Sequence, residues 1–143
     1  MAKIGRYSAD RKKVESVTGT AKTVEVSDCG TVFMMDAASS ATTFTLPAPT
    51  DAGKGWWCKF IVGVDHNDCD HVITSTAANM HTVHVVTADG TAGVTSASAP
   101  QLKVTLEGAQ SEIGDQYEVL CDGTSYFMTA ITESATAYAD ATS

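Results

Sequence analysis

Short extended segments, separated by polar turn residues, contain most of the large apolar residues of this chain. In LKVTLEG (102–108), apolar and polar residues alternate, so that Leu102, Val104 and Leu106 share one face, which predicts a half-buried strand. In TVFMMD (31–36), the apolar run is continuous, as is typical of a strand covered on both faces or at a subunit contact. We therefore expect strands to be the main elements of this fold.

The other strand candidates are rich in valine, threonine and aromatic residues. They span residues 22–27, 43–46, 55–65, 71–76 and 81–90, and residues 115–132 read as two strands around a turn. In that last segment Asp122-Gly123 is a hairpin signal, because glycine tolerates a positive φ. Valine outnumbers leucine fourteen to four, a composition that suits pleated sheets. The chain is therefore predicted to be all-β: an antiparallel β-sandwich or jelly-roll-like domain with an extended N-terminal arm.

Charge is unevenly distributed along the chain. Residues 1–13 carry a balance of +4, whereas the rest of the chain carries −12. We expect a basic arm over residues 1–18, a sandwich domain over 19–132, and a small polar tail over 133–143 that is flexible or laid along a partner chain. The acidic body argues against wrapping nucleic acid, because phosphates would be repelled outside the arm.

Cysteine usage and hydropathy bear on the compartment. The four cysteines show no CxxC spacing: Cys29, Cys58, Cys69 and Cys121. The basic start has no apolar h-region behind it, so we expect no secretory signal and interpret the cysteines as free thiols formed in a cytoplasm. No apolar run reaches the roughly 18 residues that a membrane span needs, and we expect no membrane partner.

The segment VDHNDCDH (64–71) holds the densest cluster of residue types that bind metals. A tight loop can bring His66, Cys69 and His71 together, yet five residues from one histidine to the next matches no common zinc spacing. An EF-hand calcium loop fails because its sixth position is not glycine. Asn and Asp also favour turns, since their side chains cap the backbone. We interpret this segment as a solvated hairpin loop between two strands, with a bound metal as the alternative.

Other patterns give little indication of chemistry. Trp56 and Trp57 would suit a sugar-stacking platform, but neighbours on a strand face opposite ways, so we expect one of them in the core. His81 and His84 point to opposite faces for the same reason and cannot chelate one ion by themselves. The segment DAGKG (51–55) lacks the full phosphate-binding pattern and reads as a glycine turn. We predict a protein that is not an enzyme, with no catalytic, cofactor-binding or metal-binding residues and no cofactor.

Two stretches, which together cover about half of the chain, resemble small virion proteins of tailed phages. The first is FTLPAPTDAGKGWWCKFIV followed by HVITST, which resembles a threonine-rich strand, an LPxPTxAG turn and an aromatic strand of that class. The second, GDQYEVLCDGTSYFMTAI, is similar to the hairpin that often closes these domains. Tyr126 and Phe127 stand where that hairpin usually has tryptophan then tyrosine, and Met128 replaces the usual valine.

The resemblance implies a structural protein of a bacteriophage virion, made in the cytoplasm of the host bacterium. We expect a capsid decoration, or cement, protein that binds and stabilises the outer surface of the major capsid protein shell, as a homo-oligomer with a trimer favoured. The contact residues expected in the arm, which would pair with acidic groups of the shell, are Lys3, Arg6, Arg11, Lys12 and Lys13. A tail fibre or adaptor component of the virion and a carbohydrate-binding β-sandwich module are the alternatives.

Overall fold

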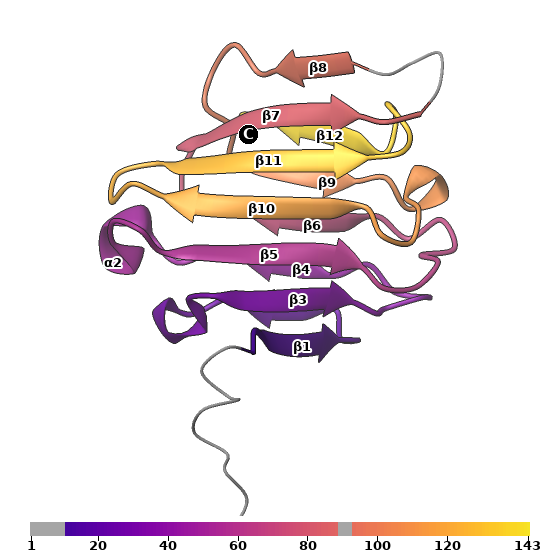
Figure 1. Cartoon of the computed structure of the whole chain (residues 1–143), viewed down its shortest axis with the longest axis horizontal. Helices are drawn as coiled ribbons and strands as arrows, with labels where there is room; N and C mark the ends of the chain where they lie inside the picture. The colour runs from indigo at the N-terminus through magenta and orange to yellow at the C-terminus, as the bar shows by residue number, and fades with distance from the viewer. Residues whose placement is uncertain (1–10, 89–92) are drawn as a thin grey trace, which may run out of the picture.

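Two packed β-sheets form the fold of the computed structural model, which describes residues 11–88 and 93–143 (Figure 1). Sheet A has seven strands, in the spatial order β1 (Lys13–Val17), β3 (Thr31–Met35), β5 (Trp57–Val62), β10 (Gln116–Cys121), β11 (Tyr126–Thr132), β7 (Met80–Val86) and β8 (Gly93–Ser96). Sheet B has five, in the order β12 (Tyr138–Ala141), β9 (Lys103–Leu106), β6 (His71–Thr74), β4 (Thr43–Thr45) and β2 (Ala21–Thr23). The all-β sandwich predicted from the sequence is confirmed.

Helical structure in the described residues is limited to short turns between strands. They are η1 (Val26–Asp28), α2 (Pro49–Ala52) and η2 (Gly108–Gln110). α2 begins at Pro49 and is followed by Gly53, whose φ of 82° turns the chain into β5. Over these same described residues, no helix combines the length and the apolarity that crossing a membrane requires.

The first half of the chain winds back and forth between the sheets. β1, β3 and β5 are parallel neighbours in sheet A, and β2, β4 and β6 are parallel neighbours in sheet B. Each parallel step thus passes through a strand of the opposite sheet, which takes the place of a crossover helix. The sheets are mixed, whereas the sequence pattern predicts antiparallel pairing, because the spacing of strand segments carries no information on the direction of their partners.

The hairpin around Asp122-Gly123 joins the two halves of sheet A. β10 pairs antiparallel with β5 on one side and with β11 on the other. Asp122 Oδ1 accepts hydrogen bonds from the backbone N–H groups of Thr124 at 2.8 Å and Ser125 at 2.7 Å, and Gly123 has a φ of 96°. The hairpin signal is confirmed, and a carboxylate bonded to its own turn explains the preference for aspartate there.

Three buried phenylalanine rings tie the sheets together. Phe33 and Phe60 of sheet A stack with ring centroids 5.4 Å apart, and Phe44 of sheet B meets Phe60 edge-on at 5.0 Å. All three are fully buried. Such aromatic contacts add about 0.5–1.5 kcal/mol per pair to the burial of the rings themselves.

Residues 13–17, which the charge pattern assigns to the N-terminal arm, form the edge strand β1. They pair in parallel with β3, from Lys13 beside Thr31 to Val17 beside Met35. Val17 is the one residue of the five that is buried. A single buried apolar residue next to several basic residues is too weak a pattern to predict a strand from the sequence.

Part of the predicted tail also belongs to the sandwich. Residues 138–141 form β12, which pairs antiparallel with β9 of the same chain rather than staying flexible or lying along a partner. Tyr138 stacks on His84 of sheet A with ring centroids 4.4 Å apart, and Ala137 is buried. A single tyrosine among small polar residues is too weak a pattern to predict a strand.

The segment VDHNDCDH connects β5 in sheet A to β6 in sheet B, so the predicted hairpin loop is wrong. Its tip is solvated: Asn67 and Asp68 are exposed and adopt φ values of 46° and 68°. His66 and His71, in contrast, are completely buried. The segment is therefore a sheet-to-sheet connection with two histidines in the core.

Candidate interaction surfaces

The outer face of sheet A consists of the side chains that point away from sheet B. Alternation along each strand sends every second residue to this face, and the strand register aligns them in rows. The central row runs across six strands through Val14, Val32, Lys59, Glu118, Thr129 and Val83.

Apolar side chains make up much of this face, and six of them are open to solvent. Its exposed apolar residues are between 37% and 68% accessible: Val14, Leu120, Phe127, Ile131, Val83 and Val94. Met34, Trp57, Ile61 and Val85 are half-buried among them. Single exposed apolar residues are ordinary, but apolar side chains gathered over neighbouring strands indicate a candidate surface for association, although polar residues of β5, β10 and β11 lie among them here.

Two opposite charges lie at the centre of this face. Lys59 on β5 and Glu118 on β10 are direct partners across the antiparallel pair, and over the described strands of sheet A they are the Lys, Arg, Asp or Glu side chains of the outer face. No ion pair within 4.0 Å joins them among the described residues. Both charged groups are therefore available to a partner that lies against the face.

Polar groups border the face at its ends. Lys12 Nζ lies 5.4 Å from the centroid of the Trp57 ring, and His81 stacks on Phe127 with ring centroids 5.2 Å apart. The face thus combines apolar side chains with a central pair of opposite charges and polar groups at its ends, and protein interfaces contain all of these side-chain types.

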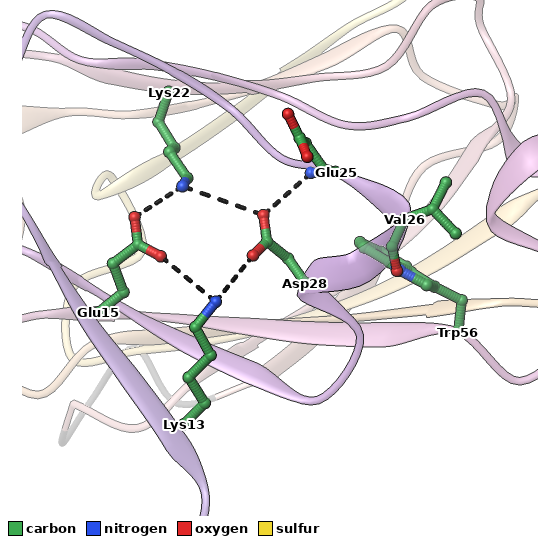
Figure 2. Close-up of polar contacts among 7 residues, drawn as sticks. All are labelled: Lys13, Glu15, Lys22, Glu25, Val26, Asp28 and Trp56. Carbon is green, nitrogen blue, oxygen red and sulfur yellow. Dashed lines mark hydrogen bonds and ion pairs between the residues drawn. The ribbon is translucent and has the colours of Figure 1, made fainter.

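A second candidate surface is an ionic cluster beside β1 and β2 (Figure 2). Lys13 Nζ donates to Asp28 Oδ1 at 3.0 Å, and Lys22 Nζ donates to Glu15 Oε1 at 2.6 Å. Longer contacts, Lys13 to Glu15 at 3.8 Å and Lys22 to Asp28 at 3.9 Å, close a ring of alternating charges. The ring links β1 of sheet A to β2 of sheet B.

Asp28 is the best buried member of this cluster. It accepts a hydrogen bond from the Glu25 backbone N–H at 3.0 Å, which closes the start of η1. Burial alone would raise the pKa of Asp28, but this N–H and the two lysines outweigh it and hold the pKa below its usual value. The hydrogen bond to Asp28 raises the pKa of Lys13. Trp56 Nε1 donates to the Val26 carbonyl at 2.9 Å and anchors η1 to the core.

The five predicted contact residues differ in their placement. Lys3 and Arg6 lie outside the described residues. Arg11 and Lys12 are exposed, the latter over an aromatic ring of β5. Lys13 is bound within the ionic cluster of its own chain, so it fixes the start of β1 rather than presenting a free charge.

The buried ends of the VDHNDCDH segment form a histidine pair. The rings of His66 and His71 lie 3.8 Å apart between centroids. His66 Nε2 lies 3.3 Å from the Met35 carbonyl and His71 Nδ1 accepts from the Thr42 N–H at 3.3 Å, which leaves His66 Nδ1 and His71 Nε2 without partners. Burial lowers the pKa of both imidazoles, that of His71 to about 4, so both are neutral near pH 7.

This pair does not make up a metal site by itself. Zinc takes three or four nitrogen or sulfur ligands, and two free ring nitrogens supply only two. Across residues 11–88 and 93–143, no group of three or more His, Cys, Asp or Glu residues is arranged to hold an ion.

The two tryptophans face opposite ways, as the sequence predicts. Trp56 is buried, and Trp57 lies half-buried on the outer face of sheet A. A platform of two adjacent rings for stacking on a sugar is therefore not formed.

The apolar outer face of sheet A is a candidate surface that the sequence analysis misses. The signal is present, because both parities of residues 57–62 and 116–132 hold large apolar side chains, among them Trp57, Ile61, Leu120 and Phe127. Reading each strand for its core face alone overlooks the second apolar stripe.

Neither a scan against protein-family models nor a search of curated proteins finds a match to this chain.

Proposed function

We propose that this protein is a virion structural protein without enzymatic activity, a capsid decoration protein that binds the outer surface of the major capsid protein shell. The proposal rests on the two stretches that resemble small phage virion proteins and on surfaces suited to association.

The observation that carries the proposal is that the basic segment, residues 1–13, ends in a residue that is fixed at the edge of the sandwich. Lys13 at the start of β1 is held by Asp28, and Asp28 is held by the η1 backbone. The basic residues that precede β1 in the sequence therefore start from a fixed point on an acidic body. A basic segment anchored in this way suits contact with an acidic protein surface.

Binding of this kind stabilises a shell by mass action. A protein that binds the mature shell and not its dissociated subunits adds its binding free energy to the stability of the particle. Arginine contributes most when its planar guanidinium holds a carboxylate with two hydrogen bonds. Several copies linked in one oligomer strengthen weak contacts through high effective concentration.

Cosedimentation with undecorated shells of the phage that produces the protein tests the proposal. The wild-type chain is expected to bind at hundreds of copies per particle and to bind more weakly at high salt, because screening weakens exposed charge contacts. The variant Arg6→Glu/Arg11→Glu is expected to raise the Kd for shells at least about tenfold.

The matched control is Lys54→Glu/Lys103→Glu, which changes the net charge by the same amount on the body of the sandwich. It is expected to bind shells within about twofold of the wild type. Equal losses in the two variants would remove the role of the basic segment. No binding by the wild type would reject decoration, and a few copies per particle would favour a tail component.

A further inference from the structure

We infer that two copies of this chain associate face to face through the outer face of sheet A, about a two-fold axis that runs along the strands between β5 and β10. The partner is a second copy of this chain, and the contact is independent of any capsid surface.

The position of Lys59 and Glu118 selects this axis. A rotation of 180° about a line parallel to the strands, midway between β5 and β10, exchanges the two strands when one sheet is laid on the other. Because Lys59 and Glu118 are direct register partners, Lys59 then lies opposite Glu118 of the partner subunit, and the reverse contact forms by symmetry. Two ion pairs result from one symmetric contact.

The other in-plane axis is disfavoured by the same charges. A two-fold axis perpendicular to the strands through this row keeps β5 over β5, so that Lys59 lies against Lys59 of the partner subunit. Glu118 would meet its own copy in the same way. Like charges at an interface cost several kcal/mol, so the axis along the strands is the complementary one.

The apolar residues match about the same axis. The rotation exchanges β3 with β11 and β1 with β7, which places Met34 opposite Ile131 and Val14 opposite Val83. Packed sheets keep their strands within about 30° of each other, so the strands nearest the axis remain in contact despite the twist. Beside the two ion pairs, the same rotation places Val32 opposite Thr129 and Ile61 opposite Gln116, so each ion pair is covered on its flanks by one apolar and one polar side chain.

A pair differs from the trimer that the resemblance implies. A three-fold contact is heterologous and joins two different patches, whereas the outer face of sheet A is complementary to itself. The mass of the purified protein distinguishes these states from one chain of 14.9 kDa.

Charge reversal and its rescue test the proposal by sedimentation velocity on the purified full chain. The wild type is expected at twice the mass of one chain. Lys59→Glu and Glu118→Lys, which each place like charges in contact twice, are expected to raise the dimer Kd at least about tenfold. The double variant Lys59→Glu/Glu118→Lys restores opposite charges and is expected to return the wild-type mass.

Three controls keep the test specific. Lys103→Glu makes the same charge change on the outer face of sheet B and is expected to leave the mass unchanged. A chain without residues 1–10 is expected to pair like the wild type, and loss of pairing would mean that this segment supplies the contact. Near-ultraviolet circular dichroism confirms that each variant is folded.

Four results would overturn the proposal. They are a wild-type mass of one chain up to roughly 100 μM, a mass of three chains, a double variant as weak as the single ones, and loss of pairing in the chain without residues 1–10. Since the measurement uses no shells, its outcome is separate from that of the decoration test.

Discussion

Sheets A and B share one hydrophobic core but present different outer faces. The outer face of sheet A carries leucine, phenylalanine, isoleucine and valine side chains that are open to solvent. The outer face of sheet B carries mainly threonine and alanine, with Thr23, Thr45 and Thr74 aligned in one row across β2, β4 and β6. The two sheets thus have apolar inner faces that pack against each other and outer faces of different composition.

Sheet B shows that an apolar outer face is not needed to build this sandwich. Threonine suits a pleated surface and leaves polar groups in water, so a sheet packed on one side alone is satisfied by such residues. The exposed apolar side chains of sheet A are therefore not required for the fold of one chain, and the proposed pairing of two copies accounts for them.

The largest expected effect on stability comes from a comparison of two neighbouring residues of β5, one on the inner face and one on the outer face of sheet A. Phe60→Ala removes a ring that contacts both sheets and is expected to lower the free energy of unfolding by about 3–5 kcal/mol. Ile61→Ala, one residue away on the half-buried outer face, is expected to cost clearly less. Urea unfolding under dilute conditions measures both, and equal losses would mean that the outer face is part of the core.

The second-largest expected effect is a pH dependence of the free energy of unfolding, which comes from His66 and His71 in the connection from β5 to β6. An unfolded histidine titrates near pH 6.5, whereas burial lowers the pKa of His66 and His71, the latter to about 4. Between these pH values the unfolded chain binds protons that the folded chain does not, so stability is full above pH 6.5 and falls as the pH drops. We expect a loss of up to about 3 kcal/mol by pH 4, measured from urea midpoints.

The variant His71→Asn is the control for this pH dependence. Its Oδ1 can still accept from the Thr42 N–H, but the side chain does not titrate. Relative to its own stability near pH 7, it is expected to lose less between pH 6.5 and 5 than the wild type. The carboxylates near the pair are Asp36, Asp65, Asp70 and Asp115. Burial raises the pKa of Asp115, which opposes the loss at the acidic end of the range. An unchanged slope in the variant would assign the pH dependence to other groups.

The fold could be predicted from strand patterns as far as the strands carry inward apolar residues. Residues 103–106 alternate as expected, with Val104 and Leu106 buried. Strands with few or no buried side chains were not predicted: β1 has one buried residue, and β8 is exposed throughout. Parallel winding between the sheets could not be predicted either, since pairing direction depends on contacts between residues far apart in the sequence.

The candidate surfaces were predictable to a smaller extent. The basic segment is visible in the sequence, but the engagement of Lys13 by Asp28 depends on η1 bringing residue 28 beside β1. The pairing of Lys59 with Glu118 likewise follows from the register of β5 and β10, which are separated by more than fifty residues. Composition therefore indicates that charges exist, and only the sheet register shows which ones meet.

A smaller effect is expected where the two sheets meet at their edge. Asp28→Asn removes the carboxylate that binds Lys13 and Lys22 and keeps the shape of the side chain. Because the pKa of Asp28 is lowered, its contribution is present above the unfolded pKa and is lost as the pH falls through the lower folded value. We expect a loss of about 1–2 kcal/mol near pH 7, reduced at high salt and in acid. Lys54→Gln, at an exposed lysine outside the cluster, is expected to have no measurable effect.

The smallest expected effect on stability belongs to a pair of substitutions that compares the outer face of sheet A directly with that of sheet B. Phe127→Ser removes a large exposed ring from sheet A and is expected to change the free energy of unfolding of the single chain by about 0.5 kcal/mol or less, because that ring is 46% accessible. It is nevertheless expected to lower the fluorescence of the apolar dye ANS at dilutions where the chain is monomeric, since the dye binds exposed apolar surface. Val72→Ser on the outer face of sheet B is the matched change and is expected to leave the dye signal unchanged. If both variants lowered the signal equally, the outer faces would be equivalent and the apolar residues of sheet A would have no special role in association.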